Sequence, residues 1–395
     1  MKFKLFIVLV LICLSCPAWS ATYYVKNGGN DEAAGTSDGT AWATVAKATS
    51  AAVHEGDTVY FNSGDTWEVS GDYPFNCVVG VIYDGKTYGD GTRATLQYSG
   101  STAYSVVMIN GTPSNTANRS TFRGFNVDIH GGRSTGIGIG TNQSASYVTI
   151  DDCLIHDTDY SQATNWYYAL TCGYGSGDVS EVIVQNCTMY NIAQEALCAY
   201  VTENGSVRST IFRGNTIHTT GLSNGHTGWG AGIEIKNDVD GLIIEYNTIY
   251  DNNYAGIHIH HDSYGTPTNI TMRYNIIHSN VCGIFWQGGD GTHYVYGNLF
   301  YNNGYHANDV IVSVDGDIHL PNVGTFYVYN NSIHRSVSAG SSGGAIHVGT
   351  GGTVTVRNNA IYATEAPGYY DNSNIATHSD NLIYRSSGTA VTDNS

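Results

Sequence analysis

The fold is decided by three related stretches of the sequence, TIFRGNTIHT (210–219), LIIEYNTIYD (242–251) and ITMRYNIIHS (270–279). Each contains alternating apolar residues, then an asparagine, one further residue, an apolar residue, and a histidine or tyrosine. The same phrase recurs along the chain, anchored by asparagine or cysteine at Cys153, Cys187, Asn215, Asn247, Asn275, Asn298, Asn331, Asn359 and Asn381. Successive anchors are 22 to 34 residues apart. This self-similarity indicates a structure built from repeated units of one kind.

These repeats predict a parallel β-helix. Alternation with a period of two is typical of strands, which excludes the helical repeat folds. The period is too short for propeller blades, and the fixed leucines of a leucine-rich horseshoe are absent. In a parallel β-helix each strand pairs with its equivalent one coil further on, so identical positions stack about 4.8 Å apart. We therefore expect one all-β domain, a single-stranded parallel β-helix of about ten coils.

The first twenty residues have the features of a secretory signal peptide. Lys2 and Lys4 precede the apolar run LFIVLVLICL (5–14), and the small residues around Trp19 fit a cleavage site between Ser20 and Ala21. The run is too short to span a membrane. We expect residues 1–20 to be removed and the product to be secreted or periplasmic.

The remaining chain divides into three predicted parts. Residues 21–75 form an N-terminal cap with its first strands, because AWATVAKATSAAV (41–53) has the small and apolar spacing of a helix. Residues 76–386 form the β-helix domain, and residues 387–395 are a C-terminal tail. A cap is expected because an open end of the helix would expose unpaired strand edges.

The composition excludes several classes of partner. The net charge of −17 at pH 7 argues against nucleic acid or an anionic membrane surface. Only 12% of the residues are charged, while 48 glycines and 30 tyrosines are typical of an ordered chain rich in strands and turns. We expect a monomer.

A family resemblance adds the handedness of the coil. TYYVKNGGND (22–31), AWATVAKA (41–48) and GDTVYF (56–61), followed by the NTI[HY] repeats, resemble secreted right-handed parallel β-helix proteins of the pectate-lyase-like superfamily. That superfamily includes polysaccharide lyases, glycoside hydrolases, uronate epimerases, phage tailspikes and adhesins. The resemblance therefore implies a right-handed coil and a polysaccharide or oligosaccharide partner, but it does not fix the reaction.

Several columns of the repeat have structural explanations. Histidines and tyrosines share one position after the anchor, which predicts a stacking ladder of His156, Tyr190, His218, Tyr250, His278, Tyr301, His334, Tyr362 and Tyr384. Arg213, Glu245 and Arg273 fall in register and predict a ladder of alternating charge. Cys153 and Cys187 occupy neighbouring anchors with parallel side chains, which favours a free buried pair over a disulfide.

The second strand of each coil is different. Its polar columns carry no consistent chemistry, whereas a structural ladder repeats one kind of residue. We aligned ALCAY (196–200), GIEIK (232–236), GIHIH (256–260), GIFWQ (283–287), IVSVD (311–315) and AIHVG (345–349). One column then holds Cys198, Glu234, His258, Phe285, Ser313 and His347, and the next holds Tyr200, Lys236, His260, Gln287 and Asp315. This irregular face is the predicted functional site.

Two long connections enter this face, residues 157–168 and 219–231. They carry the aromatic and imidazole side chains Tyr160, Trp166, Tyr167, His226 and Trp229. Aromatic walls above a polar floor suit the apolar faces of sugar rings. Trp166, Tyr167, His226, Trp229, Gln287 and Asp315 are therefore the predicted substrate-binding residues.

The chemistry favoured by these residues is β-elimination at a uronate. This reaction needs a cation near the carboxylate, a base for the C5 proton and an acid at the leaving oxygen. We expect His260 to be the base, Lys236 the electrostatic clamp and Tyr200 the acid, with His258 in the same catalytic group. Glu234 could bind Ca²⁺ or could pair with Lys236.

Two alternatives stay open. Hydrolysis needs two carboxyl groups, and Glu234 and Asp315 lie too far apart along the axis for a retaining pair, though not for an inverting one. Asp238, Asp240 and Asp262 in adjoining turns could contribute a second carboxylate. The lyases of the superfamily commonly pair an arginine or lysine base with an acidic Ca²⁺ cluster, and here no arginine lies on the candidate strands. A non-catalytic glycan-binding or adhesion protein is the remaining alternative.

Overall fold

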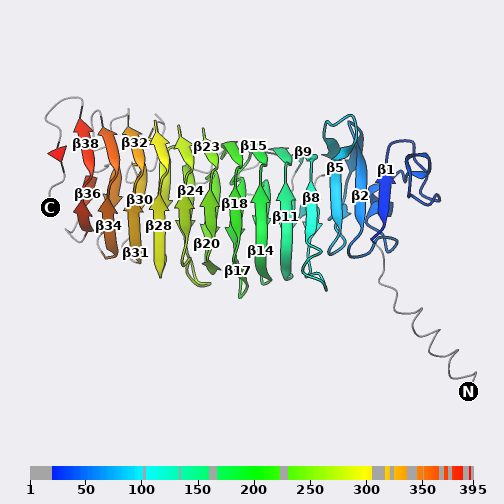
Figure 1. Cartoon of the computed structure of the whole chain (residues 1–395), viewed down its shortest axis with the longest axis horizontal. Helices are drawn as coiled ribbons and strands as arrows, with labels where there is room; N and C mark the ends of the chain where they lie inside the picture. Colours follow the sequence, from blue (N-terminus) through cyan, green and yellow to red (C-terminus); the bar gives the residue numbers. More distant parts are fainter. Residues whose placement is uncertain are drawn as a thin grey trace, which may run out of the picture.

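The computed structural model describes residues 20–100, 104–132, 135–159, 167–222, 230–304, 316–320, 324–335, 345–349, 351–363, 369–371, 376–385 and 391–392. Nearly all of the predicted signal peptide therefore lies outside the described residues. Among those that are described, no helix has the length and hydropathy needed to cross a bilayer. Figure 1 shows one long rod, in which the colours run in sequence order from one end to the other.

Three parallel sheets run along the rod, and each coil contributes one strand to each sheet in turn. Sheet 1 follows the path β1 (Thr22–Val25), β2 (Thr58–Ser63), β5 (Ile82–Gly89), β8 (Ser120–Arg123), β11 (Ala145–Asp151), β14 (Asp178–Gln185), β18 (Ile211–Arg213), β22 (Ile243–Glu245), β25 (Thr271–Arg273), β28 (Thr292–Tyr296), β31 (Thr325–Tyr329), β34 (Thr353–Arg357) and β37 (Ala376–Ser379), with β17 (Ser206–Arg208) and β21 (Val239–Asp240) beside it. The parallel β-helix is confirmed. Within the described chain this path has thirteen strands, which is more than the roughly ten coils predicted. The repeat did not reveal the first coils, because they lack the asparagine anchor.

Sheet 2 follows the anchor turn of each coil. It contains β3 (Thr66–Val69), β6 (Ala94–Tyr98), β9 (Phe125–Gly132), β12 (Leu154–Thr158), β15 (Thr188–Ile192), β19 (Thr216–Thr220), β23 (Thr248–Tyr250), β26 (Ile276–His278), β29 (Leu299–Tyr301), β32 (Ser332–Arg335), β35 (Ala360–Ala363), β38 (Leu382–Arg385) and β39 (Val391–Thr392). Strand β39 pairs antiparallel with β38, so part of the predicted tail covers an edge of this sheet.

Sheet 3 completes each coil and carries the predicted site. It contains β4 (Phe75–Asn76), β7 (Ser105–Ile109), β10 (Thr135–Ile139), β13 (Leu170–Cys172), β16 (Leu197–Tyr200), β20 (Ile233–Lys236), β24 (Ala255–His260), β27 (Cys282–Trp286), β30 (Ile318–Leu320), β33 (Ile346–Val348) and β36 (Tyr369–Asp371). Isoleucines such as Ile235 and Ile259 fill the interior between the three sheets. The large side chain of Trp286 is also buried in this interior, where its Nε1 donates to the Gly288 carbonyl at 2.9 Å.

The asparagine anchors form a buried ladder inside the turn between sheets 1 and 2. Nδ2 of Asn215 donates to Oδ1 of Asn247, and Nδ2 of Asn247 donates to Oδ1 of Asn275, each at 3.0 Å. Backbone amides of the same residues donate to the same oxygens, so these buried polar groups are satisfied. The ladder continues to Asn381. The predicted stacking of Asn215, Asn247 and Asn275 is confirmed.

The histidine–tyrosine column on sheet 2 is a stack of rings. His156 and Tyr190 lie 5.0 Å apart between centroids with planes 9° apart, and His278 lies 4.4 Å from Tyr301. The predicted stacking of these rings is confirmed. The cysteines also agree with the prediction, since Cys153 and Cys187 are free and buried. Arg273 pairs with Glu245, whereas Arg213 donates to Gln185, so the charge ladder forms only in part.

The N-terminal cap contains less helix than expected. Within residues 41–53 only α2 (Val45–Ala48) is helical, after the single turn η1 (Asp38–Thr40). Strand β1 pairs with β2 in sheet 1, so the part of the chain that the structure describes enters the β-helix almost at once. Val45 and Ala48 of the short helix are buried against the first coils.

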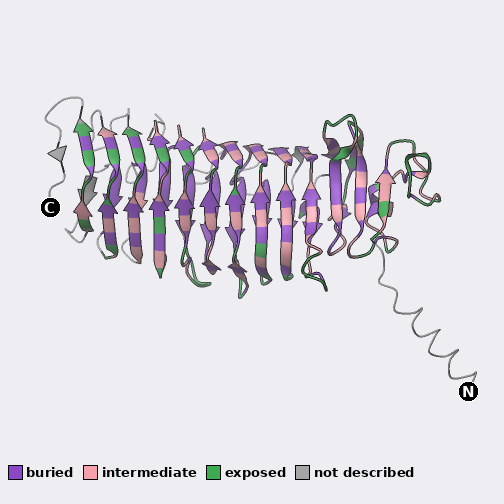
Figure 2. Ribbon diagram, in the orientation of Figure 1, coloured by how far each residue is buried: buried purple, intermediate pink, exposed green. Residues whose placement is uncertain are grey.

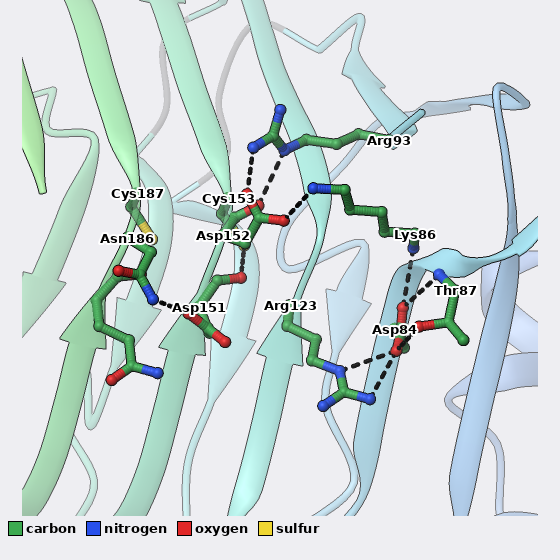
Figure 3. Close-up of polar contacts among 11 residues, drawn as sticks. Asp84, Lys86, Thr87, Arg93, Arg123, Asp151, Asp152, Cys153, Asn186 and Cys187 are labelled. Atoms are coloured by element: carbon green, nitrogen blue, oxygen red, sulfur yellow. Dashed lines mark hydrogen bonds and ion pairs between the residues drawn. The ribbon is translucent and has the colours of Figure 1, made fainter. Parts of the chain in front are cut away.

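Charged side chains bind neighbouring coils together outside sheet 1 (Figure 3). The carboxylate of Asp84 is buried and accepts from the amides of Lys86 and Thr87, both at 2.9 Å, and from Arg123 at 2.8 Å. Further along the rod, Lys86 and Arg93 both reach Asp152. Figure 2 shows that exposed residues gather in the turns and on the sheet 2 strands nearest the C-terminus.

Candidate functional site

The candidate site lies on the outer side of sheet 3, where strands β16, β20 and β24 pair in parallel. Their register places Cys198, Glu234 and His258 in one column. Tyr200, Lys236 and His260 form the next column. The relation between GIEIK and GIHIH that the repeat predicted is confirmed, and β20 and β24 are neighbours in Figure 1.

A carboxylate and two imidazoles meet at the centre of this face. His260 Nε2 lies 2.7 Å from Oε1 of Glu234, although the two residues are one coil and two positions apart. His258 Nδ1 lies 4.0 Å from the same oxygen. The two imidazole rings are stacked, with centroids 4.4 Å apart. The carboxylate of Glu234 therefore lies next to two histidines of β24.

Lys236 contacts Asp262 and Tyr200, whereas one of the predicted alternatives paired it with Glu234. Its ammonium lies 2.7 Å from Oδ2 of Asp262, and it donates to the hydroxyl of Tyr200 at 3.3 Å. The ammonium also lies 4.8 Å from the centre of the Tyr200 ring. The alternative in which Glu234 pairs with Lys236 is therefore wrong, because Asp262 at the end of β24 is closer. Asn237 positions Asp262 by accepting from its backbone amide at 2.7 Å.

His258 is fixed on all sides. Its Nε2 lies 2.9 Å from the side-chain oxygen of Gln287, one coil further on. Its ring stacks on Phe285 at 5.3 Å and meets the edge of Tyr254 at 5.1 Å. The structure therefore brings Gln287 to the site, as the sequence predicted.

Burial controls the charge of these groups. Burial raises the pKa of Glu234 to about 7, with Lys236 acting against this rise and Asp262 adding to it. Burial also lowers the pKa of His258 to about 3 and that of His260 to about 4, so both imidazoles are neutral at pH 7. Burial raises the pKa of Tyr200 and keeps its hydroxyl protonated.

Two buried residues of the site were not predicted. Glu195 precedes β16, is 1% exposed, and accepts from the Gly230 amide through one oxygen at 3.3 Å. Its other oxygen has no hydrogen-bond partner within the described residues. Burial and the charge of Glu234 raise the pKa of Glu195 well above its ordinary range. The hydroxyl of buried Tyr168 also has no partner there. Glu195 lies just before the strand segment 196–200, so the polar columns of the repeat did not include it.

The predicted alignment of the sheet 3 strands is wrong for the strand that follows β27. The strand that follows β27 is β30, which pairs Phe285 with His319. The alignment of IVSVD (311–315) placed Ser313 there and made Asp315 the neighbour of Gln287. That segment lies outside the described residues, and its apolar alternation imitates the true strand IHL that follows a few residues later. His319 and His347 therefore continue the column that contains His258.

The predicted aromatic walls lie mostly outside the described residues. This holds for Tyr160, Trp166, His226 and Trp229, as it does for Asp315. Tyr167 is described and is half-buried, next to the fully buried Tyr168. Their role in substrate binding stays a prediction.

Glu234, His258 and His260 also form a cluster that could hold a metal ion, with the three ligand atoms all within 4.8 Å of one another. One carboxylate and two imidazoles suit a borderline metal such as Zn²⁺. Ca²⁺ prefers six to eight oxygen ligands, whereas the cluster supplies one carboxylate and two imidazoles, and the nearby carboxylate of Asp262 is engaged by Lys236. Ca²⁺ at Glu234 stays a prediction.

Comparisons with known proteins agree with this architecture. A family model described as "Right handed beta helix region" matches residues 80–310. No curated protein matches the sequence. Among solved structures, the pectate lyase Pel9A is similar with a TM-score of 0.53 and 13% identity over 92% of this chain and 80% of its own. A GH136 lacto-N-biosidase from Eubacterium ramulus has a TM-score of 0.53 and 13% identity over 92% and 68%. At these identities the likeness shows the fold alone.

Proposed function

The chain belongs to the family of right-handed β-helix proteins, and from this premise we propose that it is an enzyme that cleaves a polysaccharide by β-elimination at a uronate. The two similar structures are named as a pectate lyase and a lacto-N-biosidase, both of which act on carbohydrates. The fold hosts several reactions, so the proposal rests on the site. The observation that carries it is the convergence of an imidazole, an ammonium group and a phenol, those of His260, Lys236 and Tyr200, on neighbouring strands.

His260 is the proposed base. The carboxylate of Glu234 accepts the Nε2 proton of His260 at 2.7 Å, which leaves the lone pair on Nδ1. A carboxylate that holds an imidazole in one tautomer and stabilises its protonated form is the same device that serves a serine hydrolase triad. The Nδ1 atom of His260 then removes the proton at C5 of the uronate.

Lys236 and Tyr200 complete the reaction. The ammonium of Lys236 neutralises the uronate carboxylate, replacing the half-exposed carboxylate of Asp262, and thereby makes the C5 proton more acidic. The C5–H electrons form the C4=C5 double bond as the C4–O bond breaks. The hydroxyl of Tyr200 gives its proton to the leaving oxygen, and Lys236 at 3.3 Å stabilises the resulting phenolate.

The experiment is incubation of the purified protein with a panel of uronate-containing and neutral polysaccharides. Elimination produces a double bond conjugated to the carboxylate, which absorbs ultraviolet light, together with new reducing ends. His260→Ala and Lys236→Ala should each lower turnover by about 10²-fold or more. His278→Ala in the ring ladder is the matched control and should keep its activity.

Hydrolysis is the second candidate, favoured by one observation. Glu234 has a pKa raised to about 7, which suits a general acid, and a second buried carboxyl group, Glu195, lies beside it. Reducing ends without ultraviolet absorbance would support hydrolysis. Binding of a polysaccharide without either product would support a glycan-binding protein.

A further inference from the structure

The centre of the site has the composition of a transition-metal site. Glu234 Oε1, His258 Nδ1 and His260 Nε2 lie within 4.8 Å of one another. The spacing from Glu234 to His260 is 2.7 Å and that to His258 is 4.0 Å. Ligand atoms around a tetrahedral ion with bonds of about 2.0–2.1 Å are separated by about 3.3 Å. Side-chain shifts of under an ångström therefore bring all three atoms to one ion.

His258 is already prepared as a ligand. The side-chain oxygen of Gln287 accepts a hydrogen bond, so the proton of His258 lies on Nε2. The lone pair therefore lies on Nδ1, the atom that faces Glu234. Phe285 and Tyr254 hold the ring in this orientation. A hydrogen bond from the remote nitrogen to a fixed oxygen is the usual support of a histidine ligand.

The charge of the site also favours a cation. Glu234 is only 2% exposed, and the nearest ammonium, that of Lys236, is engaged by Asp262 at 2.7 Å. A buried carboxylate is costly unless a cation compensates it. Two neutral imidazoles and one carboxylate match Zn²⁺ or Co²⁺ and leave a fourth position open.

We infer that Glu234, His258 and His260 bind one divalent transition-metal ion, represented by Zn²⁺, and that the bound ion switches off the base of the elimination. A metal ion on Nε2 of His260 uses the lone pair there. The single proton of the neutral ring then lies on Nδ1, which has no lone pair left for the C5 proton. The metal site stands on the geometry and charge of these residues, whereas the switch rests on the proposed function.

Binding is tested on the whole mature protein by titration with Zn²⁺ in a calorimeter and with Co²⁺ by visible absorption. One ion per chain is expected. Gln287→Ala should weaken binding about 10- to 100-fold, because it releases the ring of His258 without removing a ligand. Gln287 is exposed, so this variant is expected to fold. His258→Ala and Glu234→Gln should weaken binding further, and the ladder variant His278→Ala should bind as the wild type does.

The outcomes separate the two proposals. Absence of binding in the wild type, or equal affinity in the Gln287, His258 and His278 variants, overturns the metal site whatever the activity. Elimination that Zn²⁺ inhibits and a chelator restores supports the switch. Full activity of the Zn²⁺-loaded protein, or activation by Zn²⁺, overturns it. A protein that binds the ion at these residues but cleaves no polysaccharide sustains the metal site and overturns the proposed function together with the switch.

Discussion

Tyr200 shows how a single residue acquires a chemical role from its surroundings. It is buried, it lies under the ammonium of Lys236, and the edge of Tyr174 meets its ring at 5.5 Å. The tyrosines of the ring ladder, by contrast, stack on histidines at the surface of sheet 2. The same residue type is therefore the proposed acid in one column and a stacking element in another.

Replacing Tyr200 by phenylalanine tests this role. Tyr200→Phe keeps the ring that packs under Lys236 and removes only the hydroxyl. We expect turnover to fall by about 10²-fold or more, because the leaving oxygen loses its proton donor. The melting temperature should stay close to that of the wild type. Tyr190→Phe in the ladder is the matched control, and an equal loss in both variants would contradict the assignment of Tyr200 as the acid.

Residue pairing in the site was only partly predictable. The repeat placed Glu234 beside His258 and Lys236 beside His260, because a parallel stack repeats its register from coil to coil. The register did not predict that the carboxylate of Glu234 would contact His260, which lies one coil and two positions away, more closely than it contacts His258. Which side chains pair depends on their length and on their burial, and neither follows from the register. Asp262, in the turn after β24, forms the ion pair with Lys236.

At the scale of the elements, the turns between sheets 1 and 2 hold the coils in register. Asn275 donates to Asn298 and to the Ile244 carbonyl, and it accepts from the amide and side chain of Asn247. A second buried ladder of the same kind, Asn252, Asn280 and Asn303, follows the strands of sheet 2. The second ladder was not predicted, because its asparagines follow the histidine–tyrosine position in only some coils.

Asn275→Ala should break the first ladder in its middle. The substitution leaves buried donors of Asn247 and the carbonyl of Ile244 without partners, at a cost of about 1–3 kcal/mol for each group. We expect a loss of at least about 2 kcal/mol in the free energy of unfolding, measured with a chemical denaturant. Asn253→Ala is the control, since Asn253 makes an exposed bond to Gly221. Equal stabilities of the two variants would show that the ladder contributes little.

Strand assignment failed where the pattern was ambiguous. The segment IVSVD (311–315) alternates as a strand does, yet the strand that pairs with β27 is β30. The helix expected over residues 41–53 is reduced to one turn, because small residues suit a packed turn as well as a helix. Periodicity therefore located the coils but could not choose between neighbouring segments of similar hydropathy.

At the scale of the whole molecule, the predicted signal peptide leads us to expect a protein that acts outside the cytoplasm. The described chain begins at Ser20, and its first strand joins sheet 1 from Thr22 onwards. The predicted cleavage between Ser20 and Ala21 would therefore leave β1 intact. Mass spectrometry of the protein recovered from outside the cytoplasm should give a chain that begins at Ala21. An intact Met1 on the exported protein would contradict this prediction.

The rod as a whole should lose stability in weak acid, because its interior and its covered faces contain histidines that resist protonation. Burial lowers the pKa of His293 to about 4, although the backbone and charge of Asp290 act in the opposite direction. Burial also lowers the pKa of His319 to about 4, and neighbouring His347 adds to this effect. The ordinary histidine pKa is 6.5, so between about 4 and 6.5 the unfolded chain binds more protons than the folded chain. The contribution of each group to stability is complete above 6.5 and is lost as the pH falls through this window.

The variant His293→Asn isolates one of these groups. The Nδ1 atom of His293 accepts from the buried Ile270 amide at 3.2 Å, and an asparagine oxygen preserves that acceptor without titrating. Removing one histidine with this shift should reduce the pH dependence of unfolding between pH 7 and pH 4 by on the order of 3 kcal/mol. Glu234 works in the opposite direction in both proteins, since its pKa is raised to about 7, so it cancels in the comparison. Unfolding free energies measured in denaturant at several pH values should give a shallower curve for the variant. Parallel curves would mean that the pKa of His293 is the same in the folded and the unfolded chain, and they would contradict the prediction.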